Sequence, residues 1–225
     1  SNYLNSTIGS QIGSLSKLVT LRLDNNYRVD DDDTIISNGF QGTIPGSIGN
    51  LNQLVELRMD NNFIAGSLPA SLGNLKKLVT LRLEGNNLKS SIPSELGSLT
   101  RWVKKWIFLL DFVKACSSHS NISSQSLEYL HLWANYLSST ISAQLGTLNQ
   151  LKELFLDDNE LTGQIPPTLG LLSNATYISL ATNRLTGTIP PSFGMLSSLK
   201  RLDLQFNHLS GKVPYQIANT PLGKK

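Results

Sequence analysis

The stretch LVELRMDNN at residues 54–62 decides the fold, because it returns one period later as LVTLRLEGN at residues 78–86. The interval is 24 residues, and both copies keep the spacing of their apolar residues and a closing asparagine. Further copies occupy residues 18–26, 127–135, 151–159, 175–183 and 199–207. Self-similarity at such a period is typical of a solenoid, in which each unit buries its apolar edge only against its neighbours.

Each position of the repeat has a predicted physical role. Leu54, Leu57 and Met59 are expected to point inward from a short strand, and the residues between them outward. The closing asparagine is expected in a tight turn, where its side chain can satisfy buried backbone groups. Stacked repeats would then form a structural asparagine ladder of Asn26, Asn62, Asn86, Asn135, Asn159, Asn183 and Asn207.

The second half of each repeat is expected to return along the outer side of the solenoid. Proline lacks a backbone donor and therefore suits a turn or a sheet edge. Six of the nine prolines occupy one position of this half, namely Pro45, Pro69, Pro93, Pro166, Pro190 and Pro214.

The complete unit resembles the plant-type leucine-rich repeat, which reads LxxLxLxxNxLxGxIPxxLGxL. Residues 163–166 (GQIP) and 187–190 (GTIP) match the second half of that pattern. The resemblance implies an α/β solenoid, a horseshoe of about eight repeats with a parallel β-sheet on its concave face. It also implies a relation to the ectodomains of receptor-like kinases and receptor-like proteins, and to polygalacturonase inhibitors. An extracellular or cell-surface location follows from the resemblance alone.

Two interruptions of the period divide the chain. Repeats are expected over residues 1–100, where the first is partial, and over 126–217, followed by a C-terminal tail at 218–225. Twelve added residues at about 27–38 carry the four aspartates 30–33. Four carboxylates could attract calcium, but the stretch lacks the ligand spacing of a dedicated calcium loop, so a solvated acidic loop is the simpler interpretation.

The second interruption covers residues 101–125, and its removal restores the period. It holds two of the three tryptophans and the only cysteine, Cys116. One interpretation is a helical protrusion that docks a partner or a membrane surface; the other is a retained intron. Its apolar run is too short to span a bilayer. Since no capping segment is recognised, we expect a fragment or the ordered part of a larger protein, with room for a membrane anchor outside it.

Catalytic chemistry finds no support in the sequence. The three histidines, His119, His131 and His208, are far apart in the repeat pattern or lie in the insertion. Metal-ligand spacing and phosphate-binding glycine loops are not recognised. A net charge of +3 without a continuous basic face argues against nucleic-acid binding. We therefore expect a non-enzymatic chain without cofactor or metal, of unknown oligomeric state.

Outward strand residues are expected to form columns on the concave face, because neighbouring strands lie about 4.8 Å apart. Two zones follow from the residues in these columns. The charged zone consists of Arg22, Arg58 and Arg82 with the acids Asp24, Asp60 and Glu84. The aromatic zone consists of Tyr129, His131, Trp133, Phe155 and Tyr177.

The aromatic zone is interpreted as the anchor for a peptide, glycan or protein partner, because Tyr, Trp and Arg dominate interface hot spots. The arginines could recognise carboxylate or sulfate groups of the ligand. The alternative, which we favour, is that they pair with the neighbouring acids in a self-neutralised face. The expected function is recognition of a protein or peptide ligand by a receptor-like or secreted protein.

Other functions are weighed against this one. A structural or scaffolding subunit of a larger assembly is the main alternative, and an enzyme inhibitor would use the same concave face. Ice binding is least favoured, because the outer hydroxyl column is broken by Gln164 and Lys212; that column contains Thr7, Thr43, Ser67, Ser91, Thr140 and Thr188.

Glycosylation sequons occur at Asn5, Asn121 and Asn174. They would fit a secreted glycoprotein. Roughly four sequons are expected by chance in a chain of this composition, so their number is no evidence for secretion.

Overall fold

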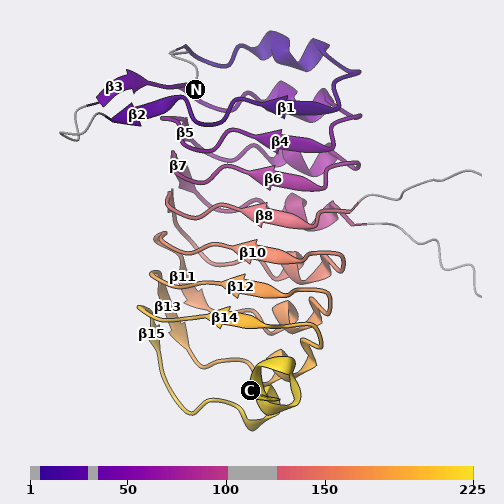
Figure 1. Ribbon diagram of the computed structural model, residues 1–225, viewed down its shortest axis with the longest axis vertical. Coiled ribbons are helices and arrows are strands. Elements are labelled where there is room, and N and C mark those ends of the chain that lie inside the picture. The colour runs from indigo at the N-terminus through magenta and orange to yellow at the C-terminus, as the bar shows by residue number, and fades with distance from the viewer. Residues whose placement is uncertain (1–5, 30–34, 101–125, 225) are drawn as a thin grey trace, which may run out of the picture.

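The computed structural model describes residues 6–29, 35–100 and 126–224. Figure 1 shows the repeats stacked along the long axis, with the N-terminal end at the top and the C-terminal end at the bottom. Within these ranges one parallel sheet contains seven strands, in the order of their sequence. They are β1 (Thr20–Arg22), β4 (Glu56–Arg58), β6 (Thr80–Arg82), β8 (Tyr129–His131), β10 (Glu153–Phe155), β12 (Tyr177–Ser179) and β14 (Arg201–Asp203). The predicted solenoid with a parallel sheet on its concave face is confirmed.

The strands stack in the register that the sequence repeat predicts. Leu57 pairs with Leu81, Leu81 with Leu130, and Leu154 with Ile178, so equivalent residues of successive repeats are direct neighbours. Strand alternation turns these apolar residues inward, where their side chains are fully buried. Each such leucine contributes roughly 2 kcal/mol of burial free energy, which explains why the core residues recur so strictly.

The outer side of each repeat is a short 3-10 helix rather than an α-helix. Each returning segment has only enough residues for one tight helical turn before the next strand begins. The described helices are η1 (Ser10–Ser14), η2 (Gly46–Asn50), η3 (Ala70–Asn74), η4 (Ser94–Ser98), η5 (Ala143–Thr147), η6 (Pro167–Leu171), η7 (Pro191–Met195), η8 (Tyr215–Asn219) and η9 (Pro221–Lys224). All six recurrent prolines sit at the N-cap of one of these helices, where the missing N–H is not needed.

Short strands along the outer edge link the repeats a second time. They form two three-stranded parallel sheets in the described residues. The first contains β5 (Ala65–Gly66), β7 (Asn87–Ser90) and β9 (Tyr136–Leu137), and the second β11 (Thr162–Gln164), β13 (Arg184–Gly187) and β15 (His208–Leu209). Gly163 in this edge has a φ of +75°, and a Cβ there would lie 2.8 Å from the Thr140 methyl, which explains the glycine of the repeat.

The asparagine side chains join each repeat to the one before it. Asn86 donates from Nδ2 to the carbonyl oxygens of Met59 (2.9 Å) and Leu83 (3.1 Å), and its Oδ1 accepts from the Ile64 N–H at 3.0 Å. Five further asparagines also donate to a carbonyl of the preceding repeat: Asn62, Asn135, Asn159, Asn183 and Asn207. One side chain therefore supplies hydrogen-bond partners to backbone groups of its own turn and of the preceding repeat.

The first interruption is more ordered than the expected loop. Its ends form an antiparallel pair, β2 (Tyr27–Val29) and β3 (Ile35–Asn38), which projects from the side of the stack in Figure 1. Tyr, Val and Ile are strong strand formers, and this explains the difference. Aspartates 30–33 lie outside the described residues.

The solenoid continues directly across the second interruption. Strands β6 and β8 pair in register, with Thr80 opposite Tyr129 and Arg82 opposite His131. The Leu127 N–H also donates to the Leu99 carbonyl at 3.3 Å. The core is therefore continuous without residues 101–125, which lie outside the described part together with Cys116.

The expected C-terminal tail is also partly folded. Helix η9 follows η8, and Leu222 packs against the end of the core. Thr220 is fully buried between the two helices and donates from Oγ1 to the Ile217 carbonyl at 2.7 Å. The repeat pattern stops before this segment, so periodicity alone could not predict its structure.

Candidate ligand-binding surface on the concave face

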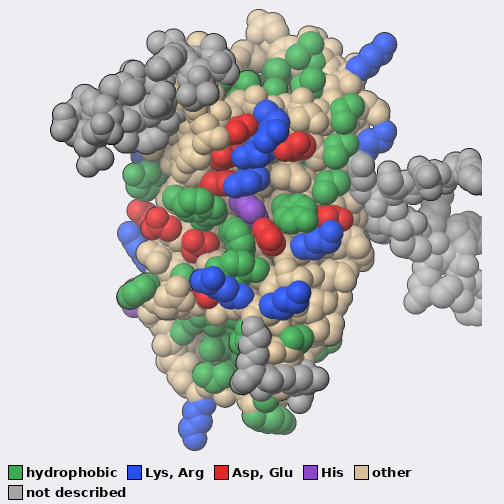
Figure 2. Space-filling model, viewed as in Figure 1, with side chains coloured by type: hydrophobic (Ala, Val, Ile, Leu, Met, Phe, Trp, Pro, Cys, Tyr) green, Lys and Arg blue, Asp and Glu red, His purple; other side chains and the backbone are tan. Residues whose placement is uncertain are grey.

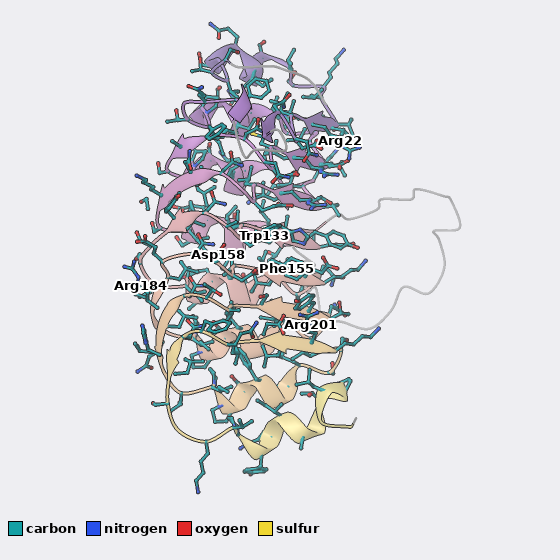
Figure 3. The ribbon with its side chains drawn as sticks, turned by 60° about the vertical axis from the view of Figure 1, so that its left-hand side comes forward. Arg22, Trp133, Phe155, Asp158, Arg184 and Arg201 are labelled. Atoms are coloured by element: carbon teal, nitrogen blue, oxygen red, sulfur yellow. The ribbon has the colours of Figure 1, made fainter. Side chains whose placement is uncertain are left out.

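The concave columns are confirmed by the strand register. Arg22 pairs with Arg58, Arg58 with Arg82, and Arg82 with His131, which in turn pairs with Phe155. Figure 3 shows Arg22, Trp133, Phe155 and Arg201 following one another down one side of the stack, with Arg184 on the opposite side. In Figure 2 charged side chains gather over the upper strands of this face, and hydrophobic side chains gather around a histidine near its middle.

The charged zone is an alternating network of arginines and acids. Arg58 lies 3.3 Å from Asp60 and 3.6 Å from Asp24, so one guanidinium links two successive strands. Arg22 extends the network with longer approaches to Asp24 (3.8 Å) and Glu56 (3.7 Å). Asp60 is only 2% exposed, although strand alternation places it on the solvent side. The arginines therefore lie over their own counter-ions.

Arg82 closes the charged zone at its boundary with the aromatic zone. Its Nε donates to Oε1 of Glu84 at 2.8 Å, and Nη2 donates to the same oxygen. Burial acts to lower the pKa of Arg82, but the hydrogen bond and charge of Glu84, with the charges of Asp60 and Asp24, raise it above its ordinary value. Glu84 itself is 1% exposed, and its Oε2 has no hydrogen-bond partner among the described residues.

The aromatic zone is a continuous chain of rings across three strands. His131 stacks on Phe155 with ring centroids 4.4 Å apart and an interplanar angle of 16°. Phe155 meets Tyr177 edge to face at 4.5 Å, and Tyr129 meets His131 edge to face at 6.5 Å. These are the preferred geometries of aromatic pairs. Trp133 takes no part in these ring contacts and is 36% exposed.

His131 is the centre of this ring chain, but it is not exposed. Its Nε2 lies 3.0 Å from Oε2 of Glu153, and only 7% of the residue reaches solvent. A carboxylate only accepts hydrogen bonds, so Nε2 carries the proton. Burial lowers the pKa of His131, although the charges of Glu84 and Glu153 oppose this effect. Its Nδ1 is buried and has no partner among the described residues.

Tyr177 ends the ring chain in a polar cluster that the sequence columns did not predict. Its hydroxyl donates to Oδ2 of Asp203, and Arg201 lies over its ring at 4.8 Å and pairs with Asp203 at 2.9 Å. Burial, together with the hydrogen bond to Asp203 and its charge, raises the pKa of Tyr177 to about 12. The cluster was missed because cross-strand diagonal contacts depend on side-chain rotamers.

Asp157 is a partly buried acid at the strand end of the aromatic zone. It follows β10 in the column that also contains Glu84 and Trp133. Burial raises the pKa of Asp157, a hydrogen bond from Ser179 opposes this, and the charges of Asp158 and Asp203 add to the rise. A cation placed near these side chains would be favoured electrostatically.

The remaining predicted sites are scattered. Asn174 is exposed and donates from Nδ2 to the Asn149 carbonyl at 2.7 Å, while Asn5 and Asn121 lie outside the described residues. The outer hydroxyl column is exposed, with Gln164 and Lys212 exposed at its two breaks. In the described ranges, three or more His, Cys, Asp or Glu side chains do not come together in a metal-binding group.

The helices of the described residues are all short 3-10 helices. Every helix in that part of the chain falls short of the length and apolarity that a bilayer crossing requires.

Comparisons with solved structures agree with the fold and the repeat. The chain is 31% identical to the leucine-rich repeat ectodomain of the Arabidopsis thaliana membrane receptor kinase GASSHO1/SCHENGEN3, solved with CASPARIAN STRIP INTEGRITY FACTOR 2 (TM-score 0.74; 97% of this chain, 25% of that chain). It is 29% identical to the Arabidopsis receptor kinase HAESA, solved with the peptide hormone IDA and the co-receptor SERK1 (TM-score 0.76; 99% and 31%). A plant ice-binding protein is 28% identical (TM-score 0.58; 81% and 61%).

The chain thus spans only 25% and 31% of the two receptor chains. A search of curated protein sequences found no match. The Leucine Rich Repeat family model matches residues 53–75, 77–99, 150–172, 174–196 and 198–220. The protein therefore belongs to the leucine-rich repeat family, and its repeats are of the plant-type extracellular class.

Proposed function

We propose that the chain is a recognition module that binds an extended peptide, or a flexible segment of a protein partner, across the concave face. The observation that carries the proposal is the ring chain of the aromatic zone. It places four rings in contact on the solvent side of a sheet, with Trp133 exposed beside them. Aromatic side chains in such a position supply large contact areas at a low cost in conformational entropy.

The shape of the surface favours an extended ligand. The columns run perpendicular to the strands, from the charged zone through His131 and Phe155 to Tyr177. An extended chain laid along this direction would meet one repeat about every 4.8 Å. Lys152 and Arg201 flank the tyrosines, lying 5.8 Å and 4.8 Å from their ring centroids, so the polar rim of the surface is complete on that side.

The related structures support this class of function. The GASSHO1/SCHENGEN3 and HAESA ectodomains were solved with CASPARIAN STRIP INTEGRITY FACTOR 2 and with a peptide hormone and co-receptor, respectively. By analogy, this chain is the ligand-binding part of a cell-surface receptor-like or secreted protein. The charged zone contributes little to affinity in this proposal, because its arginines are already paired.

Selection from a random peptide library tests the proposal without knowledge of the natural ligand. Peptides enriched on the immobilised chain are synthesised, and their dissociation constants are measured by calorimetry. Phe155→Ala and Trp133→Ala should each weaken binding by about tenfold or more, since central aromatic anchors dominate interfaces. Tyr215→Ala is the matched control, because Tyr215 is an aromatic residue of η8 that is 82% exposed away from the sheet.

Thermal unfolding of each variant shows whether the solenoid remains folded. Affinities that are unchanged in the folded Phe155 and Trp133 variants would contradict the proposal. A library that yields only peptides sensitive to Tyr215→Ala would do so as well.

A further inference from the structure

Two buried acceptor atoms lie at the boundary between the charged and aromatic zones. Glu84 and His131 are 1% and 7% exposed, and Oε2 of the first and Nδ1 of the second have no hydrogen-bond partner among the described residues. Buried polar atoms without a partner are rare, and each costs about 1–3 kcal/mol. The strand hydrogen bonds beside them run between backbone groups and use neither atom.

The backbone brings the two side chains to the same face. The Leu83 N–H donates to the His131 carbonyl at 3.0 Å, and the Gly85 N–H donates to the Trp133 carbonyl at 3.2 Å. Glu84 therefore lies between these contacts, next to Trp133 and diagonal to His131. Alternation along both strands directs all three side chains to the concave side.

Both atoms require a hydrogen-bond donor. His131 uses its Nε2 proton for Glu153, so its neutral ring offers only a lone pair at Nδ1. The Glu84 carboxylate can only accept, and Arg82 occupies its other oxygen. The charges that act on His131 are those of Glu84 and Glu153, opposed by Arg82, so acidic groups outnumber the basic one. A positively charged group with at least two N–H donors satisfies these conditions.

We propose that Glu84 and His131 form a subsite for a guanidinium or primary ammonium group of the ligand, beside the Trp133 ring. The ligand cation donates to Oε2 of Glu84 and to Nδ1 of His131, and Trp133 covers it as a cation–π partner. Trp133 follows β8 beside Glu84 and is 36% exposed, and in this proposal its side chain moves to admit the cation. The subsite rests on the proposed function, since it specifies which chemical group of the peptide the concave face selects.

Small probes test the subsite directly. The ring nitrogens of His131 are followed by nitrogen-15 NMR while N-acetyl-arginine methylamide, N-acetyl-lysine methylamide or glycine methylamide is added to the full chain. These three probes distinguish an arginine side chain, a lysine side chain and a free amino terminus. At least one should shift the Nδ1 resonance, with a dissociation constant on the order of 10 mM for so small a ligand.

The matched control is N-acetyl-citrulline methylamide, which keeps the shape of the arginine probe but is uncharged and has a carbonyl oxygen in place of one terminal nitrogen. If the arginine probe is the one that binds, the citrulline probe should bind at least tenfold more weakly. Glu84→Gln should weaken the binding of the active probe about tenfold, whereas Glu95→Gln, at an exposed position of η4, should leave it unchanged. If the Glu84 variant does not fold, the comparison of probes on the unsubstituted chain still decides.

The outcomes separate this inference from the proposed function. No response of His131 to any of the three cations, or a response to citrulline equal to the response to the arginine probe, would overturn the subsite. Library peptides that depend on Phe155 but bind the folded Glu84→Gln variant with unchanged affinity would also overturn it, and would leave the proposed function intact. A charge-dependent response of His131, with library binding insensitive to Phe155→Ala, would support the subsite and reject the wider aromatic anchor.

Discussion

In the charged zone every arginine lies within 3.8 Å of a carboxylate, whereas in the aromatic zone His131 keeps an unpaired ring nitrogen and Trp133 is 36% exposed. The two zones occupy the same sheet, in the same columns and at the same strand spacing. Their difference therefore comes from the side chains alone. The charged zone pairs all of its arginines, whereas Oε2 of Glu84 at its boundary and Nδ1 of His131 in the aromatic zone have no partner among the described residues.

The turns that follow the strands also differ between the charged zone and the later repeats. Each turn holds a residue with positive φ. The charged zone uses Asn25, Asn61 and Gly85, which tolerate this conformation, but the later repeats use Ala134, Thr182 and Phe206 besides the tolerant Asp158. Residues of this kind store backbone strain, so the later repeats carry more of it than the charged zone does.

The largest expected effect comes from Asn86, which supports both zones at their boundary. Asn86→Ala leaves the buried Ile64 N–H without its partner and removes one of two side-chain donors from the Met59 and Leu83 carbonyls, which keep Asn62 and Asn135. The free energy of unfolding in urea should fall by about 3 kcal/mol. Asn149→Ala, at an exposed position, is the control and should change it by less than about 0.5 kcal/mol. A small loss at Asn86 would mean that apolar packing alone holds the two zones together.

Next, truncation of Arg58 should mainly lower stability, whereas truncation of Phe155 should mainly lower peptide affinity. Arg58→Ala leaves the buried carboxylate of Asp60 without its counter-ion and should lower the free energy of unfolding by about 2 kcal/mol. Binding of library peptides should change by less than about threefold. For Phe155→Ala the loss should appear mainly in affinity, by about tenfold or more. Calorimetry and urea unfolding of the same two variants measure both quantities, and matching profiles would remove the distinction between the zones.

A smaller effect concerns the pH dependence of stability. Burial lowers the pKa of His131 in the folded chain, so below about pH 6.5 the unfolded chain binds the proton more readily. The contribution of His131 to the free energy of unfolding is therefore fully present above that pH. It is lost as the pH falls toward the pKa in the folded chain, by at most about 1.4 kcal/mol per pH unit. The His131→Gln variant should show a flatter dependence of the free energy of unfolding on pH between about pH 7 and about pH 5. His208→Gln, at an exposed position, should retain the wild-type slope.

The smallest effect tests the strain in the later repeats. Thr182 is β-branched and has a φ of 48°. Thr182→Asn should raise the free energy of unfolding by about 1 kcal/mol, because asparagine tolerates this conformation. Thr188→Asn provides the control, since Thr188 is exposed and is not among the residues of positive φ in the described chain. A destabilised Thr182 variant would show that its side chain, and not the backbone, determines the residue at this turn.

Much of the fold could be predicted because the repeat states each structural role many times. A leucine at a fixed interval predicts a buried strand residue, and Leu57, Leu81 and Leu130 are all fully buried. The stacking of strands also fixed the columns, so the neighbours of Phe155 were predicted correctly. The hairpin at β2 and β3 and the helix η9 were not predicted, because each occurs once and has no period to reveal it.

The candidate surface was predictable only in part. The sequence placed His131 in the aromatic zone, but its 7% exposure depends on how Phe155 stacks on it. The alternation of the strands placed Glu84 on the solvent side, but Arg82 and the neighbouring strand bury it. The column position of a residue predicts the face of the sheet to which its side chain points, whereas its exposure depends on the rotamers and lengths of the neighbouring side chains.

By itself, the sequence determined the solenoid, its register and the two zones, because an apolar period that repeats many times allows few other ways to bury its leucines. Only the tertiary structure decided which polar atoms find partners. Arg58 reaches two acids on adjacent strands, while Nδ1 of His131 and Oε2 of Glu84 remain unpaired. Hydrogen bonds act over about 3 Å, so they depend on side-chain positions that a repeating pattern of residues does not specify.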